Sequence, residues 1–152
     1  MSVISCHDPD TRRALKLFVC LTRASESFQR GALEAAPLPG NLTLSQFAVL
    51  EALYHVGPLT QTEVGRKVLK TKGNVSLVAR RLADRGLIRC TTTAGDRRSH
   101  RLELSEAGRK LMDDYFPRIA EGFTRRAEVL TAEEQETLTI LARKLGLNRR
   151  KE

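Results

Sequence analysis

The feature that most constrains the fold is a pair of helix starts lying close together in the middle of the chain. The segments TLSQ (43–46) and TQTE (60–63) both match the capping box, in which a Thr and the residue three positions later cap a helix start reciprocally. Gly57-Pro58 lies between them and ends the first helix. The sequence therefore predicts a helix over 44–56, a tight turn, and a short helix from 61 to about 68 or 69.

A third helix is expected directly after this pair. Residues 71–74 (TKGN) are typical of a cap and first turn, and Val75, Val78 and Leu82 follow at helical spacing. We expect these three apolar side chains to face inward. Gly86 is expected to end the helix in a left-handed conformation. Three short helices joined by brief turns are thus predicted over roughly 43–85.

A β-hairpin is predicted next. The segments LIRCTTT (87–93) and SHRLELS (99–105) contain alternating strand-forming residues, and they flank the turn-forming tip AGDRR. Solubility requires a polar tip, but it does not require Arg97 and Arg98 side by side after Asp96. The tip is therefore a candidate binding element.

Longer helical patterns flank this central part. One helix is expected over about 10–33, and a second begins at Ser105 and continues past Pro117, which should kink it. A third capping box, TAEE (131–134), opens a final helix. The apolar stripes of these helices consist of Leu17, Leu21, Ala24 and Phe28, widened by Leu15, Phe18 and Val19; of Leu111, Tyr115, Ile119 and Phe123; and of Leu138, Leu141 and Leu145.

The positive charge of the chain is concentrated in one segment. The formal net charge is +8, and residues 60–101 alone hold eleven Lys and Arg against three Asp and Glu. Basic and acidic residues balance in 1–59 and again in 102–152. A basic segment between neutral ones is typical of a surface that binds a polyanion, although a solvated basic surface is the simpler alternative.

Length and composition restrict the class of protein further. A chain of 152 residues suits a single domain. It lacks the pattern of a signal peptide or a membrane span, and three cysteines form no disulfide framework, so we expect a cytoplasmic protein without membrane contact. It also lacks a Gly-rich phosphate loop, a GxSxG motif and paired metal ligands. We therefore expect no enzyme activity, no cofactor and no metal.

Taken in order, the central segments resemble the MarR family of bacterial transcription regulators. The resemblance rests on NLTLSQFAVLEALYHVGPLTQTEVGRKV, NVSLVARRLADRGLIR and AGDRRSHRLELSEAGRKL, and it covers about 41–111 closely. It implies a mainly α (α+β) fold, with the whole chain, 1–152, as one domain. A winged helix-turn-helix with a two-stranded β-wing would occupy about 43–104. The terminal helices, over about 10–40 and 105–147, would form a dimerisation domain.

The resemblance also implies a mode of DNA binding. A homodimer, acting as a repressor, would bind a pseudo-palindromic operator in double-stranded DNA, with its third helix in the major groove. Asp96 and Arg98 correspond to a wing pair of the family, in which the Arg enters the minor groove and the Asp braces its guanidinium. The residues predicted to contact DNA are Thr71, Lys72, Asn74, Ser76, Arg80, Arg81, Asp96, Arg97 and Arg98.

Two classes of signal remain open for release of the operator. Members of the family commonly respond to small aromatic acids or phenols, and others respond to oxidants or quinones through a cysteine. Cys6 is the candidate redox-sensing thiol, because an imidazolium at the adjacent His7 favours the thiolate. Cys20 is expected in the core, and Cys90 on a strand. The alternative function is a winged-helix module for RNA or protein contacts, which explains the wing and the dimer helices less well.

Overall fold

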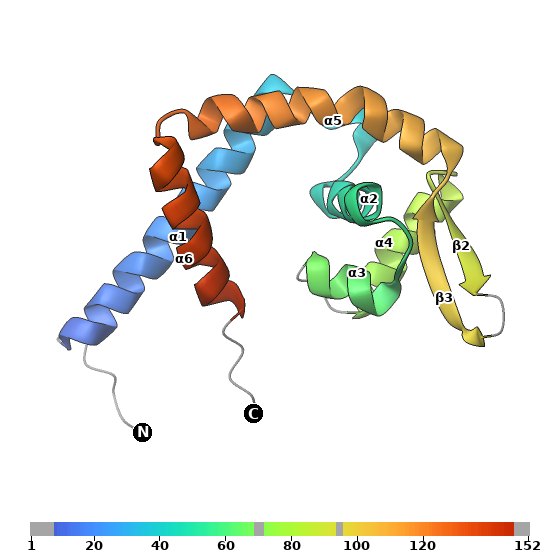
Figure 1. Cartoon of the computed structure of the whole chain (residues 1–152), viewed down its shortest axis with the longest axis horizontal. Helices are drawn as coiled ribbons and strands as arrows, with labels where there is room; N and C mark the ends of the chain where they lie inside the picture. Colours follow the sequence, from blue (N-terminus) through green and yellow to red (C-terminus); the bar gives the residue numbers. More distant parts are fainter. Residues whose placement is uncertain (1–7, 69–71, 94–95, 148–152) are drawn as a thin grey trace. The chain divides into compact units, whose positions relative to one another are not determined.

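The fold is described from a computed structural model, which covers residues 8–68, 72–93 and 96–147; the side chains at 72–73, 92–93, 96–99 and 147 are outside this description. Two compact units are present, one formed by Pro37–Arg118 and the other by Met1–Ala36 together with Ile119–Glu152. Among the helices of the described residues, none is long and apolar enough to cross a membrane. The elements, in chain order, are α1 (Pro9–Ala35), the 3₁₀ turn η1 (Pro39–Asn41), α2 (Leu44–Val56), β1 (Leu59–Thr60), α3 (Gln61–Lys67), α4 (Lys72–Asp84), β2 (Ile88–Thr93), β3 (Asp96–Leu104), α5 (Glu106–Ala127) and α6 (Ala132–Leu147) (Figure 1).

The predicted helix starts and stops are confirmed. In the capping box of α2, Thr43 Oγ1 accepts a hydrogen bond from the Gln46 N–H at 3.2 Å, and Gln46 Oε1 accepts one from the Thr43 N–H at 2.9 Å. The same reciprocal bonds open α3 and α6. Gly57 and Gly86, at the ends of α2 and α4, have φ of +89° and +69°. Glycine adopts such positive φ values more readily than other residues.

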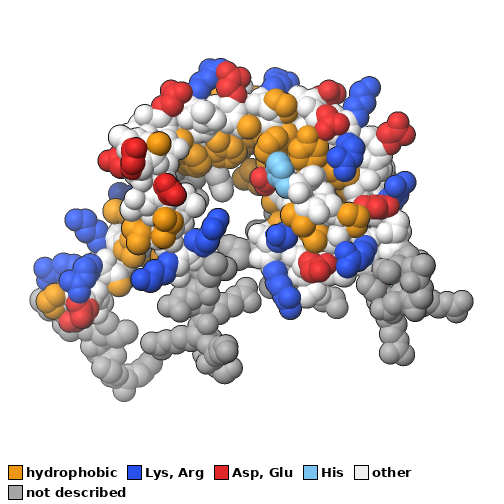
Figure 2. Space-filling model, viewed as in Figure 1, with side chains coloured by type: hydrophobic (Ala, Val, Ile, Leu, Met, Phe, Trp, Pro, Cys, Tyr) orange, Lys and Arg blue, Asp and Glu red, His pale blue; other side chains and the backbone are white. Residues whose placement is uncertain are grey.

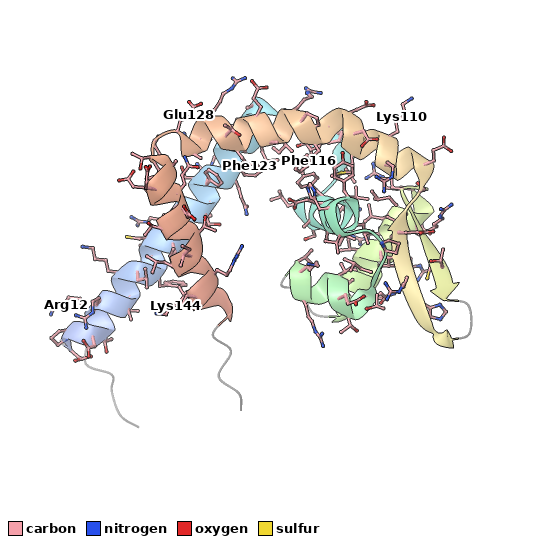
Figure 3. The ribbon with its side chains drawn as sticks, viewed as in Figure 1. Arg12, Lys110, Phe116, Phe123, Glu128 and Lys144 are labelled. Atoms are coloured by element: carbon pink, nitrogen blue, oxygen red, sulfur yellow. The ribbon has the colours of Figure 1, made fainter. Side chains whose placement is uncertain are left out.

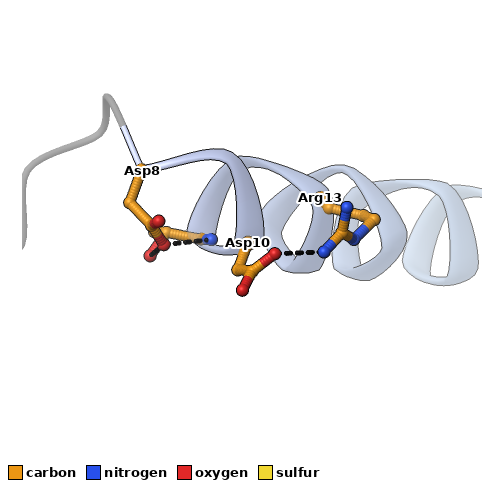
Figure 4. A network of polar contacts seen from close by, with 4 residues as sticks. Asp8, Asp10 and Arg13 are labelled. Atoms are coloured by element: carbon orange, nitrogen blue, oxygen red, sulfur yellow. Dashed lines mark hydrogen bonds and ion pairs between the residues drawn. The ribbon is translucent and has the colours of Figure 1, made fainter.

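Helix α1 begins with a side-chain cap that the sequence analysis did not identify. The Asp8 carboxylate accepts a hydrogen bond from the Thr11 N–H at 2.8 Å, and the next turn carries an ion pair between Asp10 and Arg13 (Figure 4). Accepting the Thr11 N–H lowers the pKa of Asp8, because that bond stabilises the carboxylate form. The start of this helix is therefore well defined.

The unit formed by Pro37–Arg118 is a winged helix with its own apolar core. Helices α2, α3 and α4 pack around one another, and the β2–β3 hairpin, here called the wing, extends beside them (Figure 1). Leu50, Val75 and Leu82 are fully buried, and the rings of Phe47 and Tyr115 meet edge to face with centroids 5.5 Å apart. Val75 and Leu82 face inward as predicted.

The sheet contains one strand more than the sequence predicted. Its order is β1-β3-β2, all antiparallel, and Leu102 on β3 lies between Leu59 on β1 and Cys90 on β2. Strand β1 has only the two residues Leu59–Thr60, which is too short for any alternation to reveal it. The third strand also starts earlier than expected, so that Asp96 belongs to β3 and not only to the tip.

The root of the wing packs unusually close to α5. Ser105 Oγ accepts a hydrogen bond from the Gly108 N–H at 3.0 Å and donates to the Gly86 carbonyl at 2.5 Å. A Cβ atom at Gly108 would lie 1.9 Å from the Leu87 carbonyl oxygen. Only glycine fits this position, which gives a physical reason for the Gly in the SEAG segment.

The second unit leaves much of its apolar surface uncovered. Phe123 on α5 points toward α1, where its ring lies 5.1 Å from that of Phe28 (Figure 3). Nearby, Gly122 lies against Ala32, and a Cβ atom at Gly122 would be 2.9 Å from the Ala32 oxygen. Farther along α1 and on α6, hydrophobic side chains gather at the surface (Figure 2). The exposed large ones are Leu15, Leu17, Phe18, Val19, Phe28, Val129, Leu138, Ile140, Leu141 and Leu145.

One expectation for the terminal helices is wrong, and another is confirmed. Cys20 was expected in the core, but it is exposed, because no residue in the described part of the chain covers the middle of α1. Helix α5 continues through Pro117, as the periodicity on both sides predicted. The apolar stripes thus lie on helices as expected, while many side chains of the stripes on α1 and α6 remain exposed among the described residues.

Gly108→Ala is expected to lower the free energy of unfolding by about 3 kcal/mol or more, since the new methyl group overlaps a backbone oxygen. Urea denaturation at one fixed protein concentration measures the change. The control is Gly146→Ala in α6, where a Cβ meets nothing within 4 Å, so that stability stays constant or rises by up to about 1 kcal/mol. Equal stability of the two variants would contradict the close approach at the wing root.

Candidate nucleic-acid interface

Helix α4 has a buried apolar face and an exposed polar face. Val75, Ala79 and Leu82 are 1%, 4% and 0% exposed, respectively, and hold the helix against the core. The predicted contact residues of the described part of α4 all lie on its exposed side: Asn74, Ser76, Arg80 and Arg81. Since the buried residues fix how the helix is turned, these four residues lie together at its exposed surface.

The other predicted contact residues are described only in part. Lys72 begins α4, and Asp96, Arg97 and Arg98 form the first residues of β3, where Asp96 pairs with Thr93. Their side chains are outside the described residues, as are Thr71 and Cys6 altogether. The register between β2 and β3 shifts between Thr92 and Thr93, next to the tip.

Some arginines of the basic segment bond within the protein. Arg89 forms an ion pair with Glu103 across the wing at 2.6 Å. Arg101 donates to the Pro58 carbonyl at 3.0 Å, and Arg85 donates to the Gly40 carbonyl at 2.5 Å. These arginines were not singled out by the sequence analysis, because their partners lie far away in the sequence. Some basic residues of 60–101 therefore stabilise the fold, in addition to contributing positive charge to the surface.

The acidic residue at the start of α3 is also held by the fold. Hydrogen bonds from the backbone N–H and then the hydroxyl of Thr60 lower the pKa of Glu63, and the nearby positive charges of Arg101 and Arg66 act in the same direction. Glu63 remains a carboxylate at neutral pH and partly offsets the charge of Arg101. It anchors the helix preceding α4.

A cluster of aromatic and charged side chains lies between α2 and α5 in the same unit. The ring of Phe116 is 4.6 Å from that of His55 and 5.6 Å from that of Tyr54. Tyr54 donates to Asp113 Oδ1 at 2.8 Å, which raises the pKa of the phenol, and the Arg109 guanidinium lies 6.0 Å from the Tyr54 ring centroid. Phe116 is seen pointing from α5 toward α2 (Figure 3).

This aromatic cluster (Tyr54, His55, Arg109, Asp113 and Phe116) was missed at the level of sequence. The spacing of Arg109, Asp113 and Phe116 places them on one side of α5 and could have indicated a mixed polar and aromatic face. Its contact with α2 has no local sequence signal. In the part of the chain that the structure describes, no group of His, Cys, Asp and Glu side chains is arranged to hold a metal ion.

Comparisons with known proteins extend over both units. A family model described as the MarR family matches residues 41–99. The chain is 33% identical over 138 residues to the HTH-type transcriptional regulator MhqR of Bacillus subtilis, with 91% of this chain and 94% of that protein covered. It is 31% identical over 104 residues to the HTH-type transcriptional repressor NicR of Pseudomonas putida, with 68% and 66% covered.

A solved structure has a similar fold. Bordetella bronchiseptica BpsR, whose DNA binding is described as regulated by 6-hydroxynicotinic acid, superposes with a TM-score of 0.74 at 27% identity. The superposition covers 86% of this chain and 98% of that one. The predicted winged-helix fold is therefore confirmed both by the elements of this chain and by its similarity to known structures.

Proposed function

This chain belongs to the MarR family of transcriptional regulators, whose members are not enzymes, and we propose that it is a homodimeric repressor that binds operator DNA through α4 and the wing. The observation that carries the proposal is the polar side of α4. Asn74, Ser76, Arg80 and Arg81 are exposed together on a helix whose other side is buried, within a segment of net charge +8.

In this proposal α4 is the recognition helix. Asn pairs well with adenine and Arg with guanine at the major-groove edge, so Asn74, Arg80 and Arg81 are the candidates for reading bases. Ser76 and Lys72 suit phosphate contacts, and Thr71, which precedes α4 in the sequence, would offer its backbone amide to an anion at the helix start. These contacts would set both the register on the duplex and the sequence that is preferred.

The wing supplies the second proposed contact. A narrow minor groove concentrates negative potential, which favours an inserted guanidinium such as that of Arg98. Asp96 would brace this guanidinium, and Arg97 would bind phosphate. The ion pair between Arg89 and Glu103, together with the bond from Arg101 to Pro58, stiffens the strands that carry these three residues.

The exposed apolar stripes support the proposed dimer. Phe18 on α1 is 65% exposed, and Leu141 and Leu145 on α6 are each 57% exposed. Contiguous apolar surface of this kind is typical of protein interfaces and costly in water. A two-fold dimer formed through α1 and α6 would present two copies of α4 to half-sites about one helical turn apart.

A small aromatic acid is the signal we propose for release of the operator. Two relatives support this regulatory scheme, since NicR is named a repressor and the DNA binding of BpsR is regulated by 6-hydroxynicotinic acid. The aromatic cluster offers ring faces at Phe116 and His55 and a cation at Arg109, which suit an aromatic ring and a carboxylate. Modification of Cys6 is the second candidate signal.

Arg98→Ala and Arg80→Ala are each expected to weaken specific operator binding by about 1–3 kcal/mol, because each removes a groove contact. Fluorescence anisotropy on labelled DNA from upstream of the protein's own gene, with nonspecific competitor present, measures the loss.

The affinity of the parent protein for operator DNA should also fall steeply as the salt concentration rises, since phosphate contacts release counterions. The same assay, repeated at several salt concentrations, measures this dependence.

The matched control for these variants is Arg143→Ala, which removes the same charge from an exposed position on α6. It is expected to bind the operator like the parent protein. If nonspecific competitor abolishes binding to every upstream DNA tested, while the protein binds an RNA or another protein, the alternative of a winged-helix module for other partners is correct.

Leu141→Glu is expected to shift the dimer toward monomer by at least about tenfold in dissociation constant, because it buries a charge in an apolar interface. Sedimentation equilibrium measures this constant. Arg143→Gln changes the net charge by the same amount on the opposite side of α6 and should leave dimerisation intact. A parent protein that is monomeric at micromolar concentration would refute the dimer.

Addition of an aromatic hydroxy acid such as 6-hydroxynicotinate is expected to weaken operator binding of the parent protein, and Phe116→Ala is expected to reduce this response. The same anisotropy assay reports both. A response to quinone or peroxide that is lost in Cys6→Ser, with no response to aromatic acids, would instead identify thiol modification as the signal.

A further inference from the structure

A hydrogen bond joins the end of α4 to the turn that precedes α2. Arg85 is the first residue after α4, and its Nη2 atom donates to the Gly40 carbonyl at 2.5 Å. The two residues are 45 positions apart in the chain and lie in the same compact unit. The bond therefore constrains where the helix ends relative to the start of α2, independently of the chain connection.

The acceptor side of this bond is held in an unusual backbone conformation. Gly40 and Asn41 both have φ of +57°, so the turn η1 uses two consecutive left-handed residues. A hydrogen bond of 3.1 Å from the Leu42 N–H to the Pro39 carbonyl closes this turn, and Leu42 is buried. A Cβ at Gly40 would lie 3.1 Å from Arg85 Nη2, so glycine permits both the conformation and the contact.

The donor side is equally well defined. After α4 the Gly86 N–H donates to the Ala83 carbonyl at 2.8 Å, and the Leu87 N–H donates to the Leu82 carbonyl at 3.0 Å. Leu87 is buried, and its own carbonyl accepts from the Ser105 N–H at 3.1 Å. Arg85 thus extends from a fixed helix end toward a fixed acceptor.

Apolar packing alone restrains α4 less completely. The side chains of Val75, Ala79 and Leu82 oppose separation of α4 from the core, but apolar contact is not directional and tolerates small shifts along the helix axis. A hydrogen bond requires a defined distance and angle and so opposes such shifts. An axial shift of α4 would displace the exposed residues Asn74 and Arg80 by the same amount.

We propose that Arg85 is a positioning residue for operator recognition, whose bond to the Gly40 carbonyl fixes the axial position of α4 and so the alignment of its exposed side chains with base edges. The inference rests on the proposed function of α4. Base contacts depend on this alignment, whereas mobile Lys and Arg side chains satisfy phosphates in several positions. Loss of the bond therefore lowers specific binding and spares nonspecific binding.

A direct phosphate contact by Arg85 predicts a different result. An arginine that neutralises a phosphate contributes about one unit to the slope of log affinity against log salt concentration, on specific and nonspecific DNA alike. A positioning residue contributes nothing to that slope. The salt dependence consequently separates the two roles even when both weaken the complex.

The test compares Arg85→Ala and Arg85→Gln with the parent protein on operator and on nonspecific DNA at several salt concentrations. Arg85→Ala is expected to lower operator affinity about tenfold, the loss typical of one charge-assisted hydrogen bond, with nonspecific affinity and both salt slopes unchanged. Arg85→Gln retains an N–H donor without the charge and should recover part of the operator affinity. Circular dichroism establishes that each variant is folded.

Two results would overturn the proposal: operator affinity equal to that of the parent, or a shallower salt slope with equal losses on both DNAs. If Arg85→Ala does not fold, Arg85→Gln replaces it in the test. Its salt slope and its ratio of operator affinity to nonspecific affinity are then judged by the same criteria. Arg80→Ala, measured in parallel, separates this proposal from the function it rests on. If Arg80→Ala is also without effect, the assignment of α4 as the recognition helix fails, and not the role of Arg85 alone.

Discussion

The packing of α4 on the core is the constraint on which the rest of the winged helix depends. Val75 and Leu82 are fully buried, so the helix has a single allowed rotation about its axis. That rotation exposes Asn74, Arg80 and Arg81 together. The same apolar residues that stabilise the unit therefore select which polar residues are exposed, so that stability and the proposed recognition of DNA depend on one helix.

The wing is held by a second set of contacts that are mainly polar. The close approach of Gly108 to the Leu87 carbonyl fixes its root on α5, and Arg101 holds β3 to the segment before α3 through the Pro58 carbonyl. Strand β1 adds a short pairing on the other edge of β3. A hairpin isolated in water is only marginally stable, so these contacts are what allow the wing to extend from a small core.

Much of this architecture was predictable from local sequence, because caps and helical periodicity are local properties. The capping boxes beginning at Thr43, Thr60 and Thr131 and the left-handed Gly86 appear where the sequence predicted them. Strand β1, the bond from Arg85 to Gly40 and the aromatic cluster were not foreseen, because each joins segments distant in the chain. The contacts of Asp96 and Arg98 with DNA remain predictions.

The exposed stripes of α1 and α6 are the surface through which the proposed dimer would form. Full burial of an exposed apolar side chain contributes about 1.5–3 kcal/mol. Covering the partly exposed Phe18 and Leu141 would contribute less than this for each residue and would favour the proposed dimer. Each winged helix alone offers only a short basic surface. Pairing two such surfaces in the proposed dimer would raise affinity for DNA through effective concentration rather than through new contacts. In the proposed dimer, any signal that altered the spacing of the two copies of α4 would act on both half-sites at once, which would make the position of α4 a sensitive point for control.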